Sequence, residues 1–160
     1  MAQLEAGMKA PAFDLVDQAG RRHRLADYAG KPLVLFFYPK ANTSGCTAQA
    51  CSVRDAREEF GQLGASAIGI SPDAPEQQRK FDEKQGLGFP LLADTEHAVC
   101  EAYGVWAEKQ MYGRTYWGVV RSAFLIGDDG RIAAAFYKVS PLDTVPKLRT
   151  ALEAVGDKKR

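Results

Sequence analysis

Two cysteines stand five positions apart in the segment PKANTSGCTAQACSV, residues 39–53, directly after the apolar run LVLFFY. The spacing of apolar residues changes from that of a strand to that of a helix near Thr43, so Cys46 is expected in the first turn of a helix. Backbone N–H groups at a helix start lack partners within the helix and carry roughly half an elementary positive charge. They stabilise a thiolate, the nucleophilic form of cysteine. The sequence therefore predicts a reactive thiol at Cys46.

The residues just before Cys46 fit this role. Thr43 supplies a hydroxyl that is able to cap the helix or to reach a ligand beside the sulfur, and Gly45 leaves the backbone bare next to the thiol. The alternative is that Cys46 is a small apolar residue of the core. It belongs to a stripe of helical spacing that comprises Cys46, Ala50, Val53, Ala56, Phe60 and Leu63.

Cys51 is placed differently from Cys46. Five residues in an intact helix turn the side chain by about 140° and separate the two Cα atoms by roughly 8.6 Å. A disulfide needs Cα atoms closer than about 7 Å, so the first helical turns must unwind before the two thiols can join. On this geometry Cys51 points away from the core stripe. The pair is thus a candidate for a switch between two backbone states.

The surrounding elements predict an α/β fold. Two short strands joined at Ala19-Gly20 form an N-terminal hairpin, and Asp129-Gly130 marks the turn of a later one. Buried strands alternate with helices between them, which favours a central mixed sheet flanked by helices. The expected strands lie within 13–25, 31–39, 65–71, 89–94 and 121–139, and the expected helices within 43–63, 75–86, 95–105 and 141–155, with Pro146 limiting the start of the last helix or kinking it.

Composition limits the classes of function. The chain has 160 residues, which suits a single domain over residues 1–160, and its basic end, residues 157–160, is expected to be a flexible tail. A formal charge of +1 argues against nucleic-acid and membrane partners. No secretory signal and no membrane-length apolar run are visible, so a cytoplasmic location is expected. There, three cysteines are not expected to form a static disulfide framework.

The segment YPKANTSGCTAQACSVRD resembles the active-site segment of the peroxiredoxins, in particular the Q-type or bacterioferritin-comigratory subfamily. Pro39, Thr43 and Cys46 fit the family frame of proline, three residues, threonine, two residues and cysteine. Cys51 matches the position of the subfamily's second cysteine, and Arg121 opens a strand as the family's active-site arginine does. The segments MYGRTYWGVV and FDLVDQAG add to the resemblance. The chain departs from the usual pattern at two positions, with Ala41 in place of an aspartate and Ser44 in place of a proline.

The resemblance implies a thioredoxin-like fold and a thiol peroxidase. Cys46 would attack a hydroperoxide and become a sulfenic acid, and Cys51 would resolve it as an intramolecular disulfide that a thioredoxin-type donor reduces. Thr43, Arg121 and backbone amides near Cys46, including that of Gly45, would hold the peroxide oxygens. Pro39 would shield the sulfenic acid from water. Neither a metal nor an organic cofactor is required, and the protein is expected to be a monomer.

Several assignments remain open at this stage. Trp117 or Tyr116 is a candidate for an apolar rim beside the site, although Trp106, Tyr112, Tyr116 and Trp117 as a group are expected to be mainly packing and loop residues. Cys100 is expected to be a buried thiol, with a back-up resolving role as its alternative. A thioredoxin-like disulfide oxidoreductase is a second candidate function. A non-catalytic zinc site is the third, formed by Cys46, Cys51, His97 and Cys100.

Overall fold

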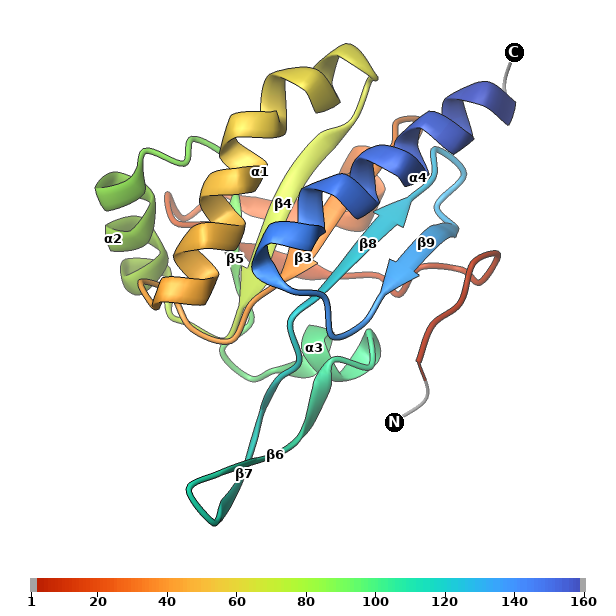
Figure 1. Cartoon of the computed structure of the whole chain (residues 1–160). Helices are drawn as coiled ribbons and strands as arrows, with labels where there is room; N and C mark the ends of the chain where they lie inside the picture. Colours follow the sequence, from red (N-terminus) through yellow and green to blue (C-terminus); the bar gives the residue numbers. More distant parts are fainter. Residues whose placement is uncertain (1–2, 159–160) are drawn as a thin grey trace.

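A five-stranded mixed sheet forms the centre of the computed structural model, which describes residues 3–158 (Figure 1). β3 pairs in parallel with β4 and β4 with β5, while β8 pairs antiparallel with both β3 and β9, which gives the order β5-β4-β3-β8-β9. The expected mixed sheet, with alternating buried strands and helices and a late antiparallel hairpin, is therefore confirmed. The strands are β3 Leu33–Phe37, β4 Ser66–Ser71, β5 Leu91–Ala93, β8 Ser122–Ile126 and β9 Ile132–Phe136.

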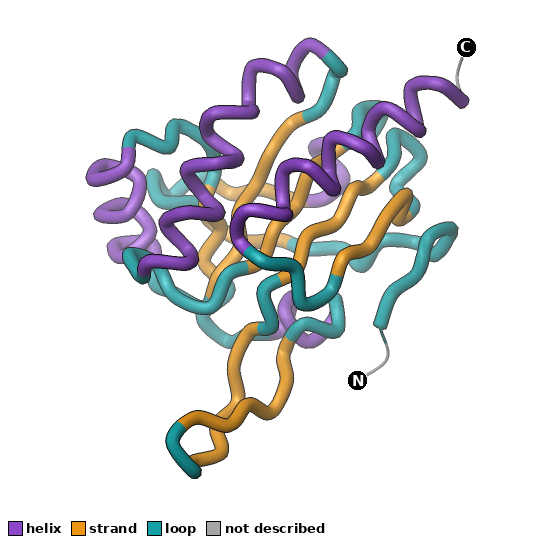
Figure 2. Tube along the Cα trace, in the orientation of Figure 1, coloured by secondary structure: helices purple, strands orange, loops and turns teal. Residues whose placement is uncertain are grey.

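Helices cover the sheet on both faces (Figure 2). The helices α1 and α4 lie side by side on one face, and α2 extends this layer beside β5 (Figure 1). The other face is covered by the short helix α3 and by the N-terminal segment. The helices are α1 Ser44–Gln62, α2 Pro75–Gln85, α3 Ala98–Ala102 and α4 Thr144–Lys158, with 3-10 turns at Leu25–Tyr28 and Pro141–Asp143.

Strand β3 shows why the run LVLFFY is apolar throughout. Side chains alternate between the two faces of a strand, so a strand covered on both faces needs apolar residues at every position. Val34 and Phe36 pack in the core beneath α1 and α4, whereas Leu35 and Phe37 pack in the core on the opposite face. All four side chains are fully buried. Because β3 is packed on both faces, it fixes the position of the loop that follows it.

Two antiparallel hairpins lie outside the central sheet. The expected N-terminal one consists of β1 Asp14–Val16 and β2 Arg22–Arg24. The second, β6 Trp106–Met111 with β7 Arg114–Val119, was not expected and projects from the body of the molecule (Figure 1). The turn of this hairpin needs positive φ at both central residues, and tyrosine is unusual there, so the sequence lacked the ordinary signal.

The assignment of Trp106, Tyr112, Tyr116 and Trp117 to packing and loop positions thus holds for two of them: Trp106 packs against the core and Tyr112 lies in a turn, whereas Tyr116 and Trp117 are exposed strand residues. Three are strand residues of the hairpin, and Tyr112, which lies in its turn, is 97% exposed. Tyr116 and Trp117 are also exposed. The hairpin therefore presents Tyr112, Tyr116 and Trp117 to solvent, whereas Trp106 at its base is partly buried.

The last helix begins at Thr144, which places Pro146 in its first turn, where a missing N–H breaks no helical hydrogen bond. Of the expected tail 157–160, residues 157 and 158 belong to α4, and 159–160 lie outside the described residues.

Within residues 3–158, no helix has the length and apolar character needed to cross a membrane.

Candidate active site

The thiol of Cys46 lies in the first turn of α1, as predicted. Asn42, with a φ of 64°, turns the chain out of the segment after β3, and Thr43 occupies the N-cap position. The Thr47 N–H donates to the Thr43 carbonyl at 2.8 Å, so the N–H groups of Gly45 and Cys46 precede the first bond of the helical ladder. Cys46 is completely buried. The thiol therefore sits against the positive end of the helix dipole and away from bulk water.

Arg121 contacts this thiol, although it follows 75 residues later in the chain. It lies directly before β8, and the register of the sheet pairs Ser122 with Phe37 at the end of β3. This pairing brings the arginine to the point from which α1 begins. Its Nη1 atom donates to the Cys46 Sγ at 3.5 Å. The structure thus joins two of the predicted site residues in one contact.

Two hydrogen bonds that involve side chains anchor the loop between β3 and α1. The Thr43 hydroxyl donates to the Lys40 carbonyl at 2.7 Å and does not cap the helix, so a side-chain capping role is excluded in this structure. The Ala41 N–H donates to Asp73 Oδ2 at 2.8 Å. These bonds hold the loop in place although Ser44 stands where the subfamily usually has proline.

An apolar groove of about 430 Å³ opens beside this loop. Pro39 and Thr43 line one side of the groove, and Trp117 of β7 lines the other together with Tyr116. Trp117 is 57% exposed, so much of its ring remains available for contact. The predicted apolar rim is therefore present as a geometric feature, next to the loop that precedes Cys46.

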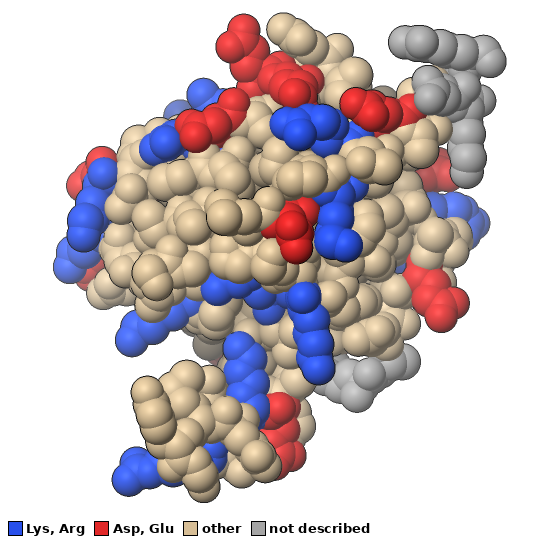
Figure 3. Space-filling view, in the orientation of Figure 1, with Lys and Arg blue, Asp and Glu red and all other residues tan. Residues whose placement is uncertain are grey.

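Basic side chains gather where the hairpin meets the body of the molecule (Figure 3). Lys109, Arg121 and Lys138 line a common hollow there. Burial lowers the pKa of Lys109, and the positive charge of Arg121 lowers it further, whereas the sulfur of Cys46 acts in the opposite direction. Burial raises the pKa of Tyr38, whose hydroxyl donates to Gln78, so this neighbour of the site stays neutral. Arg121 and Lys109 thus both interact electrostatically with the sulfur of Cys46.

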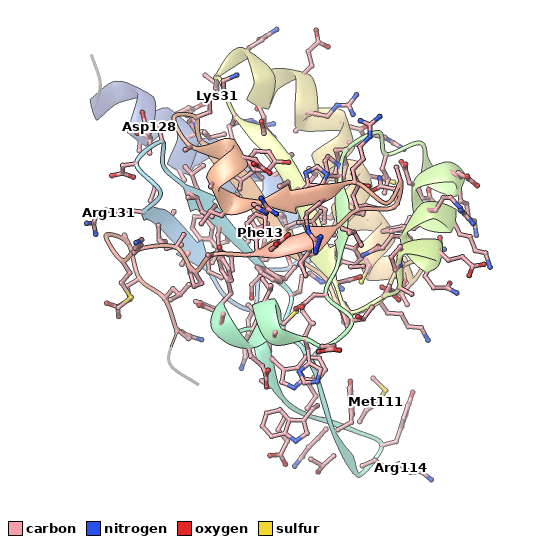
Figure 4. All side chains as sticks on the ribbon, turned by 180° about the vertical axis from the view of Figure 1, so that it is seen from behind. Phe13, Lys31, Met111, Arg114, Asp128 and Arg131 are labelled. Atoms are coloured by element: carbon pink, nitrogen blue, oxygen red, sulfur yellow. The ribbon has the colours of Figure 1, made fainter. Side chains whose placement is uncertain are left out.

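A separate hollow of about 580 Å³ lies at the other end of the sheet. Lys31 and Asp128 are among its lining residues. Figure 4 shows these two at one end of the molecule, while Met111 and Arg114 mark the tip of the β6–β7 hairpin at the other end. This hollow begins where β3 starts, whereas Cys46 follows the end of β3, so it does not belong to the site.

Cys51 lies further along the uninterrupted helix α1, and both it and Cys46 are free thiols. The expectation that its side chain points away from the core needs correction, because Cys51 is partly buried and packs at the edge of the core cluster that contains Cys46. Its Sγ donates to Gln85 Oε1 at 3.7 Å, at the end of α2. The second thiol is therefore enclosed between two helices.

Cys100 lies on the opposite face of the sheet, in the core beneath α3. It is completely buried, and burial together with the Asp94 carboxylate raises the pKa of its thiol. This confirms the expectation of a buried thiol. The proposed zinc set is not assembled, since no cluster of three or more His, Cys, Asp or Glu side chains suited to a metal ion occurs in the described part of the chain.

Gln49 is a site residue that the sequence analysis missed. It is completely buried, and its Oε1 accepts a hydrogen bond from Arg121 Nη1 at 2.9 Å. Gln49 lies three residues after Cys46 and four before Val53, which places it on the buried stripe of α1. Leu63, which the sequence analysis assigned to this stripe, is instead 45% exposed. A polar residue at an apolar position of a helical stripe was the available signal.

Gly45 provides the space that the guanidinium occupies. A Cβ atom built at this position would lie 2.9 Å from Arg121 Nη2. We expect Gly45→Ala to push the arginine away from the sulfur and to lower the rate of the thiol's reaction with hydrogen peroxide by about 10- to 100-fold, as small misplacements of reacting groups do. Because alanine favours a helix by up to about 1 kcal/mol over glycine, the free energy of unfolding should not fall.

Gly61→Ala is the matched control in the same helix, since a Cβ there meets no atom within 4 Å. It should bring the same gain in helix propensity without a loss of rate. Stopped-flow kinetics and thermal melts of both variants test this pair of expectations. An unchanged rate in Gly45→Ala would show that the position of Arg121 does not depend on the missing side chain.

The chain is similar in sequence to known proteins. A model of the AhpC/TSA family matches residues 6–135. Peroxiredoxin Bcp of Bacillus subtilis is 44% identical over 155 residues, covering 97% of this chain and 99% of that protein, and peroxiredoxin Bcp of Escherichia coli K12 is 48% identical over 136 residues, covering 85% and 87%.

The fold is similar to that of solved structures. Peroxiredoxin Q of Xanthomonas campestris superimposes with a TM-score of 0.87 at 35% identity, covering 93% of this chain and 97% of that one. A structure of the bacterioferritin comigratory protein of the same organism, described in terms of its alkyl peroxide reduction activity, gives a TM-score of 0.87 at 34% identity, with 94% and 98% covered. The thioredoxin-like fold is thereby confirmed. The chain belongs to the AhpC/TSA family and, within it, to the Bcp and peroxiredoxin Q group of thiol peroxidases.

Proposed function

We propose that Cys46 is the peroxidatic cysteine of this peroxidase and that Arg121 activates it. The observation that carries the proposal is the 3.5 Å contact between Arg121 Nη1 and Cys46 Sγ at the start of α1. A guanidinium and a helix N-terminus both favour the thiolate, so both stabilise negative charge on the Cys46 sulfur. The complete burial of Cys46 favours a small peroxide group as its reaction partner over a bulky protein disulfide.

In the proposed reaction the Cys46 thiolate attacks the terminal oxygen of a hydroperoxide. A sulfur–oxygen bond forms as the oxygen–oxygen bond breaks, and the leaving oxygen takes up a proton and departs as water or an alcohol. In this proposal Arg121 and the backbone N–H groups of Gly45 and Cys46 stabilise the negative charge that develops on this oxygen, while the Thr43 hydroxyl, whose hydrogen goes to the Lys40 carbonyl, faces the hydroperoxide as an acceptor. Cys46 is left as a sulfenic acid.

The substrates in this proposal are hydrogen peroxide and organic hydroperoxides. The activity named for the Xanthomonas campestris protein supports alkyl peroxides, and so does the groove between Pro39 and Trp117, which offers an apolar surface to the organic part. Pro39 also limits the access of water to the sulfenic acid.

We further propose that Cys51 resolves the sulfenic acid. Its thiol attacks the Cys46 sulfur, the disulfide forms and water leaves. The first turns of α1 must unwind for this step, and the Cys51 thiol must break its hydrogen bond to Gln85. A thioredoxin-type dithiol then reduces the disulfide by exchange and is itself oxidised. All proposed residues come from one chain, which suits a monomer.

The direct test is a count of free thiols in the reduced protein before and after one equivalent of hydrogen peroxide, with peptide mapping of the product. We expect the count to fall from three to one, with Cys46 joined to Cys51 and Cys100 unchanged. Survival of all three thiols would contradict the proposed chemistry.

Replacement of Cys51 by serine separates the two steps. We expect Cys51→Ser to complete one turnover at the wild-type rate and then to stall, because the Cys46 sulfenic acid has no thiol to condense with. Steady-state turnover with a thioredoxin system should fall by about 100-fold or more, which is of the size found when a group needed for one chemical step is removed. Sustained cycling at the wild-type rate would show that Cys51 is not the resolving thiol.

A further inference from the structure

Exposed apolar side chains gather on the β6–β7 hairpin. Of the seven large apolar side chains that the described residues leave exposed, four lie on this hairpin: Met111, Tyr112, Tyr116 and Trp117. The other three lie singly on separate segments. Single exposed apolar residues are ordinary on a protein surface, whereas a group of them on one element indicates a contact surface.

The backbone of Tyr112 supports the same reading. Its φ is 52°, in the left-handed region that glycine and asparagine tolerate far better than an aromatic residue. The side chain is 97% exposed, so contacts within the chain do not offset the cost of this conformation. Backbone strain of this kind clusters at functional positions. The ring at the tip of the hairpin therefore suits a contact with another molecule.

The hairpin carries its tip as a regular ribbon beside the thiol. Six residue pairs join β6 to β7 in register, and Trp106 at the base packs against the core. Met111 lines the apolar groove whose other side is formed by Pro39 and Thr43. A molecule that rests on the tip therefore comes to lie next to the loop that leads into Cys46.

The surroundings of the tip are basic. Lys109 and Arg114 belong to the hairpin, Lys40 lies on the same groove, and Lys138 lines the hollow at the base of the hairpin. None of these four side chains takes part in an ion pair within residues 3–158. Glu108 is the one carboxylate of the hairpin. Figure 3 shows Lys and Arg side chains together where the hairpin meets the body. This charge is complementary to acidic side chains on a partner.

The composition of the tip favours a protein as this partner. Tyr, Trp, Met and Arg are enriched in protein–protein contacts, and the segment MYGRTYW, residues 111–117, contains all four. Hydrogen peroxide is too small to cover such a surface. The proposed catalytic cycle involves one protein partner, which is the dithiol donor that reduces Cys46 and Cys51.

We infer that the tip of the β6–β7 hairpin, with Tyr112 as its apolar anchor and Arg114 as its charged flank, is the docking surface for this dithiol protein. The inference rests on the proposed function. The partner carries an apolar patch with acidic side chains beside an exposed thiol. Its thiolate attacks one sulfur of the Cys46–Cys51 disulfide, and the other sulfur leaves as a thiolate. The partner's second thiol then breaks the mixed disulfide, which leaves both cysteines reduced and the partner oxidised.

Tyr112→Asn separates docking from stability. Asparagine tolerates the left-handed backbone better than tyrosine, so the melting temperature should stay the same or rise. The kcat/KM for thioredoxin, measured with thioredoxin reductase and NADPH at saturating hydrogen peroxide, should fall by about 10-fold, as the loss of an anchor residue of an interface does. With dithiothreitol in place of thioredoxin, turnover should equal that of the wild type, because a small dithiol needs no docking surface.

Arg114→Gln tests the charge. Exposed charges at the edge of an interface act mainly on the rate of association, and salt screens them. The kcat/KM of this variant for thioredoxin should therefore be lower than that of the wild type at low ionic strength. It should approach the wild-type value as the salt concentration rises. Turnover with dithiothreitol should again be unchanged.

Two exposed residues elsewhere provide matched controls. Leu63→Asn removes an exposed apolar side chain at the C-terminal end of α1, the end remote from Cys46. Arg131→Gln removes an exposed arginine that lies well away from Arg114 (Figure 4). Both variants should keep the wild-type kcat/KM for thioredoxin and its dependence on salt.

The outcomes separate the docking surface from the proposed function. Wild-type kcat/KM for thioredoxin in Tyr112→Asn and Arg114→Gln would overturn the inference. With kcat/KM unchanged, binding to phosphatidylglycerol vesicles that Tyr112→Asn abolishes would assign the tip to a membrane surface instead. Likewise, a dimer in analytical ultracentrifugation that Tyr112→Asn dissociates would assign it to a second copy of the chain. Absence of the Cys46–Cys51 disulfide after peroxide treatment would refute the proposed function itself.

Discussion

Replacement of Cys46 by serine is expected to abolish peroxidase activity, with a loss of at least about 10⁴-fold, while the fold is kept. A serine hydroxyl does not ionise near neutral pH, so neither the helix start nor Arg121 can turn it into a nucleophile comparable to a thiolate. Cys46 is completely buried, and its Sγ accepts a hydrogen bond from Arg121, which a serine oxygen can also accept. We therefore expect a change in the free energy of unfolding of only about 1 kcal/mol.

Cys100→Ala is the control for the loss of a buried cysteine. Its thiol lies on the other face of the sheet and is kept protonated by burial and by Asp94, so its removal should leave the rate unchanged. Peroxide consumption and a melting curve for both variants decide the matter. Turnover in Cys46→Ser, or its loss in Cys100→Ala at an unchanged melting temperature, would contradict the assignment of the nucleophile.

Most of the fold could be predicted from the sequence because the spacing of apolar residues in each element matches the side of that element that is buried. The apolar run of β3 is covered on both faces, and the stripe of α1 from Cys46 to Phe60 lies in the core. Such periodicities follow from which side of an element is buried, and that is a property of short segments. The β6–β7 hairpin was missed for the opposite reason. Beyond its base the hairpin is mostly exposed, and Tyr112 occupies a turn position that normally favours asparagine or glycine.

The site could be predicted only as far as its residues form a motif. Thr43, Gly45 and Cys46 are neighbours in sequence, and the family frame added Pro39 and Arg121. The hydrogen bonds from Gln49 to Arg121 and Thr144 could not be predicted, because they depend on the relative positions of α1, β8 and α4. The enclosure of Cys51 beside Gln85 depends in the same way on the packing of α2 against α1. Contacts between elements that are far apart in the chain cannot be predicted from the pattern of a single sequence.

The second large effect is expected from Arg121→Ala. Removal of the guanidinium takes away a hydrogen-bond donor to the Cys46 sulfur and the positive charge that stabilises the leaving oxygen, so the rate of the peroxide step should fall by about 10²- to 10³-fold. The effect on the free energy of unfolding should be smaller. Arg121 is only partly buried, and the main cost is the unpaired oxygen of Gln49, roughly 1–3 kcal/mol. Stopped-flow kinetics with hydrogen peroxide and a melting curve measure the two effects separately.

Arg121→Lys distinguishes charge from geometry. A lysine keeps the positive charge but lacks the planar fork, and in the structure a single guanidinium nitrogen bonds both Cys46 Sγ and Gln49 Oε1 while the second lies over Gly45. If charge alone were responsible, the lysine variant would match the wild type. We expect it instead to recover only part of the lost rate, because the ammonium group cannot fill both positions of the fork. A lysine variant as slow as Arg121→Ala would mean that the aimed N–H donors, and not the charge, carry the whole contribution of this residue.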